Sequence, residues 1–324
     1  MKKRYFKIIV LVLALLLVSC FIPYGSRNTY YLTPNNGWGH FVYWGWIKQH
    51  AIVRMATDSR LENMALHSRK PCYRAMAFEK LANKRNPKCQ EILIAELTDT
   101  SKFKTQWLDL TYETDVITYD MTLVEEDSLL FTKDQRHHID SVIVFEPGLD
   151  HLDRRPSATR LYRMEGVYER VRELCLHGDS NLLPAIAEYQ QTADIPLVTK
   201  ALLENKQYEP TINALEAIMK WRNEAFAPAL EELCDQSLEM GRLGIPGLRL
   251  YFAIVMGYDN EWAYHLIDNW FENWGKESIT APEILYEAYY GGEEIVRFLP
   301  LVEKYGKEPL NWEQERDYIR NLLN

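Results

Sequence analysis

The sequence predicts an all-α fold, an α-solenoid of stacked helical hairpins with a small irregular or β-containing insertion. Prolines recur between residues 184 and 305 at separations of 18, 18, 36 and 18 residues. Proline is favoured at the start of a helix, where its missing N–H breaks no hydrogen bond. Apolar residues then follow at helical spacing, and a 36-residue period with two helices per unit is typical of helical-repeat proteins. The prolines are Pro210, Pro228, Pro246, Pro282 and Pro300.

The composition is that of a folded, acidic protein. The chain has 324 residues, of which 47% are hydrophobic and 26% charged, so a disordered chain is excluded. Its formal net charge is −9, and no dense Lys/Arg cluster follows the first few residues. An acidic surface repels the phosphate backbone, so nucleic acid is not an expected partner.

Residues 1–19 have the features of a secretion signal. Four basic residues among the first seven precede the apolar run 8–18, which at 11 residues is too short to span a bilayer comfortably. The run ends in Leu17-Val18-Ser19-Cys20, which resembles the lipobox of bacterial lipoproteins. The resemblance implies cleavage before Cys20 and acylation of Cys20, with palmitate-type chains that anchor the protein to a lipid bilayer. An ordinary cleaved signal and an uncleaved anchor are the alternatives.

Residues 20–37 are predicted to be a lipidated tether, because they are rich in turn-forming Pro, Gly, Ser and Asn. No acidic residue directly follows Cys20. Among lipoproteins this absence implies the periplasmic face of the outer membrane, within the cell envelope.

Residues 38–99 are predicted to form N-terminal helical hairpins. The aromatic stretch 38–46 is interpreted as a first helix that caps the array, with contact to the bilayer surface as the alternative. Further on, Pro71 and the segment 74–82 are followed by a turn and a second amphipathic helix that ends near Asp99. This pattern resembles a HEAT repeat, which implies two antiparallel helices per unit.

Residues 100–155 interrupt the helical pattern and are predicted to be an insertion. Apolar residues alternate with polar ones from Ile117 to Leu123, which favours a strand, although a short helix fits as well. A helix is expected from Asp134, as its cap, to Phe145. Residues 156–324 are predicted to be the C-terminal helical-repeat array. It includes a helix over 161–176 and a last helix over 310–323 that is capped by Asn311.

No catalytic or metal-binding motif stands out, so we expect a non-catalytic protein without cofactor or metal. Adjacent His137 and His138 point about 100° apart on a helix and do not converge on one ion. Cys175, His177 and Asp179 lie at a helix end and do not face one another as a nucleophile, a base and an orienting group would. The acidic run 125–127 lacks calcium-binding spacing. Cys72 and Cys89 are expected to be buried thiols, with a disulfide between them as the alternative.

Aromatic residues near the C-terminus form a candidate binding face. Core packing explains most such residues, while a protein-binding face and a glycan-stacking platform are the functional alternatives. The candidate residues are Trp262, Trp270, Trp274, Tyr286 and Tyr290.

Taken together, these features favour a membrane-anchored lipoprotein that acts as a non-catalytic protein-binding scaffold in the cell envelope. Solenoids present long surfaces suited to a protein partner. One alternative is a periplasmic immunity or inhibitor protein whose acidic surface suits a basic target. Another is a glycan-binding or glycan-processing helical-repeat protein.

Overall fold

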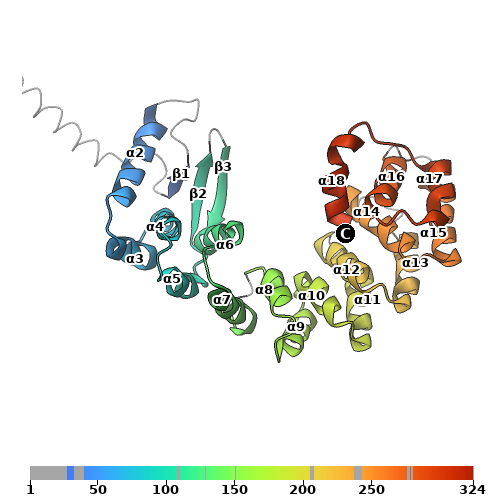
Figure 1. The fold of residues 1–324 in the computed structure, drawn as a ribbon, viewed down its shortest axis with the longest axis horizontal. Coiled ribbons are helices and arrows are strands. Elements are labelled where there is room, and N and C mark those ends of the chain that lie inside the picture. Colours follow the sequence, from blue (N-terminus) through green and yellow to red (C-terminus); the bar gives the residue numbers. More distant parts are fainter. Residues whose placement is uncertain are drawn as a thin grey trace, which may run out of the picture. The chain divides into compact units, whose positions relative to one another are not determined.

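A computed structural model gives the fold of the chain and describes residues 28–32, 40–107, 110–127, 129–149, 151–204, 208–236, 243–275, 278 and 280–323. These residues are mostly helical, with one small three-stranded sheet, as the sequence predicted (Figure 1). The chain divides into two compact units, residues 1–152 and 153–324. Among the described residues, no helix combines the length and the apolar character needed to span a membrane.

Unit 1 contains six helices and three strands among its described residues. The strand order is β1-β2-β3, with β1 parallel to β2 and β2 antiparallel to β3. The elements in chain order are β1 (Thr29–Tyr31), α2 (His40–Arg54), α3 (Asp58–His67), α4 (Pro71–Asn83), α5 (Cys89–Glu96), β2 (Lys102–Trp107), β3 (Leu110–Asp115), α6 (Val116–Glu126) and α7 (Lys133–Phe145).

Local signals explain where several of these helices begin. Pro71 is the first residue of α4, as predicted. The side chain of Thr132 caps α7 by accepting a hydrogen bond from Gln135 N, and Oε1 of Gln135 accepts one from Thr132 N in return. The predicted cap Asp134 is therefore wrong, and it lies inside the first turn instead.

The predicted strand over residues 117–123 is wrong, because this segment belongs to α6. Asp115 caps the helix by accepting a hydrogen bond from Thr118 N at 2.8 Å. The fully buried residues Ile117, Asp120 and Val124 follow the three- and four-residue spacing of a helix. The strands of this region lie earlier, at 102–107 and 110–115. Residues 100–152 therefore pack with the hairpins as part of unit 1.

The predicted tether is wrong for residues 29–31, which form strand β1 and pair in parallel with β2. Tyr30 and Tyr31 are both buried. The Tyr30 hydroxyl donates to Glu79 Oε2 at 2.6 Å, which connects β1 to α4. The ring of Tyr31 lies against Gly45, where an added Cβ would come within 2.8 Å of it. Burial of two tyrosines therefore outweighs the turn-forming residues around them.

Unit 2 is helical throughout its described residues. Short 3₁₀ turns precede several of the helices. The α-helices are α8 (Arg155–Arg160), α9 (Val167–Leu176), α10 (Leu183–Ile186), α11 (Ile195–Glu204), α12 (Tyr208–Trp221), α13 (Ala227–Gln236), α14 (Gly244–Met256), α15 (Glu261–Asn273), α16 (Ala281–Gly291), α17 (Leu299–Tyr305) and α18 (Trp312–Leu323).

The proline-marked helices are confirmed. Pro228, Pro282 and Pro300 are the second residues of α13, α16 and α17, and Pro210 and Pro246 are the third residues of α12 and α14. The helix predicted over 161–176 begins only at Val167, because Gly166 has φ +80° and interrupts it.

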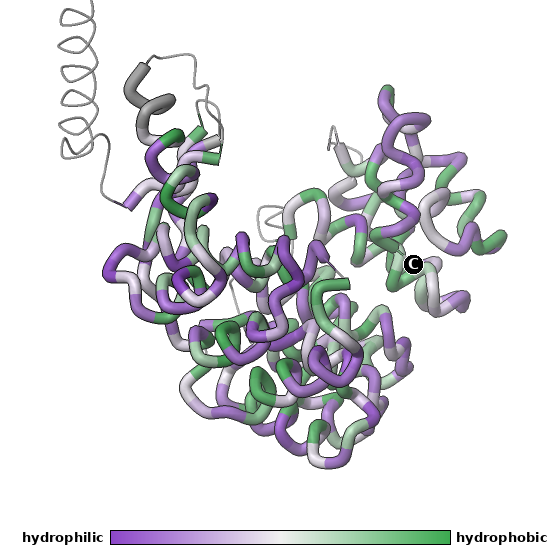
Figure 2. Tube along the Cα trace, turned by 60° about the vertical axis from the view of Figure 1, so that its left-hand side comes forward, coloured by the Kyte–Doolittle hydropathy of each residue, from purple (hydrophilic) through white to green (hydrophobic). Residues whose placement is uncertain are grey.

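The helices of unit 2 pack in an alternating order. Each of α10, α12, α14 and α16 packs against the second helix after it, and so do α11 and α15. Ten consecutive residues of α14, from Gly247 to Met256, are buried, which places this helix at the centre of the unit. Figure 2 shows hydrophobic and hydrophilic residues interspersed along the helical trace, as expected for amphipathic helices with one buried face.

Candidate functional site

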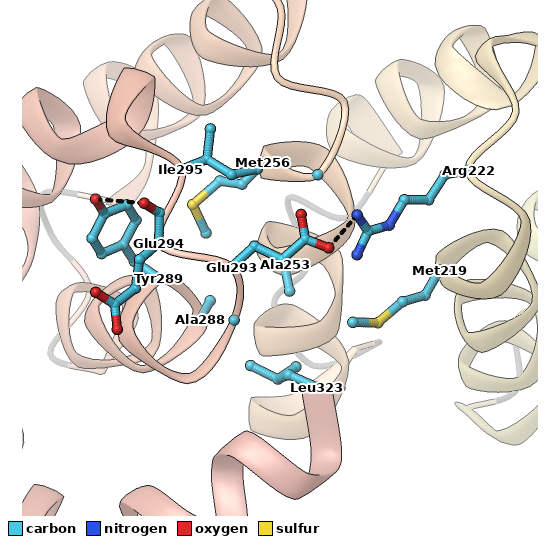
Figure 3. Close-up of a pocket in the computed structure, with 12 residues that line it drawn as sticks. Met219, Arg222, Ala253, Met256, Ala288, Tyr289, Glu293, Glu294, Ile295 and Leu323 are labelled. Carbon is cyan, nitrogen blue, oxygen red and sulfur yellow. Dashed lines mark hydrogen bonds and ion pairs between the residues drawn. The ribbon is translucent and has the colours of Figure 1, made fainter.

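Four helices of unit 2 end around one pocket. The last residues of α12, α14, α16 and α18 are Trp221, Met256, Gly291 and Leu323. Residues at or next to these four ends line a shallow hollow that is open to solvent, with a cavity volume of about 20 Å³, little more than a water molecule needs (Figure 3). Because these helices pack side by side and run in the same direction, their carboxyl ends meet at one edge of the unit.

The walls of the pocket are mostly apolar. Met219 and Met256 lie on different sides of it, Leu323 lies below them, and Ala253 and Ala288 form part of the lining (Figure 3). Methionine is flexible and polarisable, so it adapts to ligands of different shape. This apolar wall can therefore contact the aliphatic part of a side chain that lies across the hollow.

An ion pair lies across the pocket. Arg222, the first residue beyond α12, places Nη1 2.5 Å from Oε1 of Glu293, which follows α16 (Figure 3). Arg222 has φ +43°, a left-handed conformation that is uncommon for residues other than glycine. Its guanidinium lies against Gly257, where an added Cβ would come within 3.0 Å of Cζ. The absence of a side chain at Gly257 therefore makes room for this position of Arg222.

The carboxylate of Glu294 points away from that of Glu293 (Figure 3). Glu294 Oε1 accepts a hydrogen bond from Arg320 Nη2 at 3.2 Å, and the backbone oxygen of Glu294 accepts one from the Tyr289 hydroxyl at 3.3 Å. Burial, then the nearby Tyr290 and Glu294, raise the pKa of Tyr289 above its usual value. Tyr289 is therefore a neutral hydrogen-bond donor in this wall.

The electrostatic character of the pocket is negative apart from Arg222. Each helix carries roughly half a negative charge at its carboxyl end, and four such ends meet here. Of the two carboxylates in the lining, Glu293 is paired with Arg222 and Glu294 with Arg320. Unit 2 as a whole has 29 acidic and 18 basic residues, a formal net charge of −11 over residues 153–324. The site therefore suits a positively charged group, and Arg222 already provides one from within the chain.

The predicted aromatic face does not form as a single surface. Trp270 is only 4% exposed and packs edge-on against Phe252, so its place on a binding face is wrong. Its position on α15 points into the interior, where the large ring fills space between helices. Trp262 is half-buried at the start of α15, and Trp274, just beyond its end, is 51% exposed. Twelve residues of helix separate them by about 18 Å.

Tyr286 and Tyr290 do lie together, on α16. Both are half-buried, with ring centroids 4.4 Å apart, and Tyr286 also packs edge-on against Trp312 at 5.6 Å. These contacts fasten α18 to α16. They leave a smaller aromatic surface than a row of five stacked residues would give.

The other sequence candidates lie apart from the pocket. His137 and His138 are exposed on α7, and no group of three or more potential metal-ligating side chains occurs in the described part of the chain. Cys175 is buried, and burial together with nearby Asp179 raises its pKa to about 12, so it is a protonated thiol rather than a nucleophile. Asp127, from the acidic run, pairs with Arg85.

The cysteines divide into two groups. Cys72, Cys89, Cys175 and Cys234 are buried, and none of them forms a disulfide in the described structure. Cys20, the predicted lipidation site, lies outside the described residues, as does most of the tether.

Sequence reasoning missed Met219 and Arg222, which are ordinary residues at the end of a predicted helix. Glu293 was expected only as an acid near the late aromatic residues, and more than 70 residues separate it from Arg222. One signal was present: the proline period implies that alternate helices run in the same direction, so their last turns meet. Comparison of the chain with protein-family models, with curated proteins and with solved structures finds no match.

Proposed function

We propose that this chain is a lipid-anchored α-solenoid that acts as a non-catalytic scaffold and binds a protein partner in the cell envelope through the pocket of unit 2. The observation that carries the proposal is a set of contacts between residues about one repeat apart. In a solenoid each repeat touches only its neighbours, so such separations should recur.

The recurring separations lie between 32 and 38 residues. Asn213 donates to Asn181 at 2.9 Å across 32 residues, and Lys304 to Asp268 at 3.0 Å across 36. The Tyr258 hydroxyl donates to the backbone oxygen of Asn223 at 2.8 Å across 35 residues. Residues with a positive, left-handed φ angle recur at a similar spacing. They are Gln190, Arg222, Asp259 and Glu294. These regularities support a repeat of roughly 35 residues.

Unit 1 offers a related contact. Arg74, inside the segment that resembles a HEAT helix, donates through Nε and Nη2 to both oxygens of Asp99 at 2.6 and 3.0 Å. Asp99 lies just after α5, so the pair connects the start of one helix to the end of the next. This geometry supports the HEAT-like interpretation of residues 70–99.

The chemistry of the pocket indicates what part of a partner it takes. A lysine or arginine side chain has an aliphatic stem, which suits the methionine-lined wall, and a charged end, which suits Glu293 and the four helix ends. Arg222 acts as an internal substitute for that charged end. The negative net charge of unit 2 would also speed association with a basic partner.

Site-specific photocrosslinking in intact cells tests the proposal. A photoreactive amino acid at Met219, inside the pocket, should capture one defined protein through a basic segment. The matched control is Lys200, an exposed residue on α11 that is not part of the pocket lining. Equal capture at both positions, or no capture at Met219, would contradict a partner site at the pocket.

A further inference from the structure

Two acidic side chains face each other in the apolar core of unit 1. Glu96 is the last residue of α5 and Asp120 lies in the middle of α6. Glu96 is 4% exposed and Asp120 is 0% exposed. The side chains around them on the two helices include Ile92, Leu93, Val116, Ile117 and Val124, all members of the core.

Neither carboxyl group meets a donor from another described residue. All four carboxyl oxygens are buried and lack an N–H or O–H partner within the described structure. The hydrogen bond open to each is the one to the other carboxyl. Such a bond needs a proton on one of the two groups.

The charged groups around the pair do not replace that proton. Arg74 of α4 is a cation that acts on Glu96, but its guanidinium is committed to Asp99. The other titratable neighbours are Glu79 of α4, Asp99 itself, the thiol of Cys89 on α5 and the hydroxyl of Tyr119 on α6. Glu79 and Asp99 are carboxylates, so they oppose a second negative charge on the pair.

Another buried aspartate shows what a satisfied one looks like in this chain. Asp194, in unit 2, is also 0% exposed, but it accepts hydrogen bonds from Tyr168 Oη at 3.0 Å and Arg172 Nε at 2.8 Å. Glu96 and Asp120 therefore differ from Asp194 because they lack a hydrogen-bond donor, and not because they are buried.

We propose that Glu96 and Asp120 hold one proton between them, and that release of this proton to water is a pH-dependent switch that loosens α6 from α5. Two adjacent carboxylates cannot both stay ionised without solvent or a cation. Once the proton leaves, the repulsion between the two carboxylates can fall only if water enters between the helices. Entry of water requires the helices to separate.

The pKa values support the direction of the switch. Burial raises the pKa of Glu96 and outweighs the hydrogen bond with Asp120, which lowers it, while burial followed by Glu96 raises the pKa of Asp120. Because the folded pKa values exceed those of the unfolded chain, the folded unit binds more protons above about pH 4.5. The contribution of this pair to the stability of unit 1 is therefore greatest at low pH and falls as the pH rises through the raised values, by about tenfold in the unfolding equilibrium per proton and pH unit.

The position of α6 gives the switch a route to the rest of unit 1. Strand β3 ends at Asp115 and α6 starts at the next residue. Tyr119, beside Asp120, donates to Glu79 Oε2 at 3.0 Å, and Tyr30 of β1 donates to the same oxygen. A shift of α6 therefore pulls on the contact that holds β1, the first described strand after the predicted anchor at Cys20 in the sequence.

Hydrogen exchange of the full-length chain tests this inference, which does not depend on the proposed function. The readout is the protection of amides in residues 116–126 at about pH 5 and about pH 8.5, corrected for the intrinsic exchange rate. We expect protection to fall at least tenfold at the higher pH, while peptides from α14 in unit 2 change little.

Two variants and a matched control decide the result. In Asp120→Asn and in Glu96→Gln, the amide donates to the remaining carboxylate without needing the shared proton, so the drop in protection should shrink to less than about threefold. Asp194→Asn, the control, should leave the drop in α6 intact. An unchanged protection of α6 in the natural chain, or a full drop in either amide variant that folds, would overturn the proposal.

Discussion

Arg249 of α14 and Glu287 of α16 form a buried ion pair, in which Nε and Nη2 of the guanidinium both donate to Oε2 of the carboxylate. The two residues are 8% and 7% exposed and lie 38 positions apart in the sequence. The pair therefore joins two neighbouring repeats of the proposed solenoid through its interior.

Breaking this pair should destabilise unit 2 strongly. Glu287→Ala leaves the Arg249 guanidinium buried without its partner, which costs about 3–5 kcal/mol. The double variant Arg249→Met, Glu287→Leu removes both charges and should be close to neutral. Chemical denaturation followed by circular dichroism measures both. Equal destabilisation by the single and double variants would show that packing, rather than charge, determines the cost.

The pair formed by Arg74 and Asp99 should give unit 1 an opposite, acid-sensitive contribution. Burial tends to raise the pKa of Asp99, but hydrogen bonds from Arg74 and Ser101 outweigh it and leave the pKa below its usual value. Because the folded pKa is depressed, this contribution is present above about pH 4 and is lost as the pH falls through the folded value. Stability measured across pH should show this loss on the acid side.

Arg74→Gln checks the same pair directly. It should cost about 1.5–3 kcal/mol near neutral pH and much less near pH 2, where Asp99 is protonated. Lys84→Gln is the matched control, because Lys84 pairs with Asp58 on the surface, where the side chains are 39% and 53% exposed. That substitution should change stability by less than about 0.5 kcal/mol. A cost for Arg74→Gln that does not vary with pH would argue against an electrostatic role.

The predicted lipid anchor gives a clear-cut expectation. Metabolic labelling with a palmitate analogue should mark the natural chain, and Cys20→Ala should lose the label and move the protein from the membrane fraction to the soluble fraction. Cys72→Ala is the control, because Cys72 is buried in the core and should not affect labelling. Label retained in the Cys20 variant would place the acyl chain elsewhere.

Much of the helical fold could be predicted because its signals are local. Pro71, Pro228 and Pro282 mark helix starts through their own backbone chemistry, and each lies in the first turn of a helix. Segment 116–126 was harder, because its half-buried residues Tyr119, Met121 and Leu123 imitate the alternation of a strand. Its capping residue Asp115 was the better indicator. Strand β1 depends on partners at Glu79 and Gly45 that no local pattern reveals.

The candidate pocket could be predicted only in outline. The period of the prolines implies that helix ends meet at one edge, but it does not say which side chains line that edge. The position of Arg222 depends on the bare Cα of Gly257, 35 residues later, and on Glu293 beyond that. Large aromatic residues suggested a binding face, but the same residues also fill helix interfaces, as Trp270 does in the core.

The central claim is that the pocket of unit 2 takes a basic side chain of a partner protein. The most direct measurement is the yield of crosslinking from Met219 in intact cells, compared among the natural chain, Arg222→Met and Glu293→Gln. Arg222→Met removes the internal competitor and should raise the yield about two- to fivefold, while Glu293→Gln should lower it by a similar factor. The opposite pair of changes, a lower yield with Arg222→Met and a higher one with Glu293→Gln, would contradict the account and indicate an acidic partner.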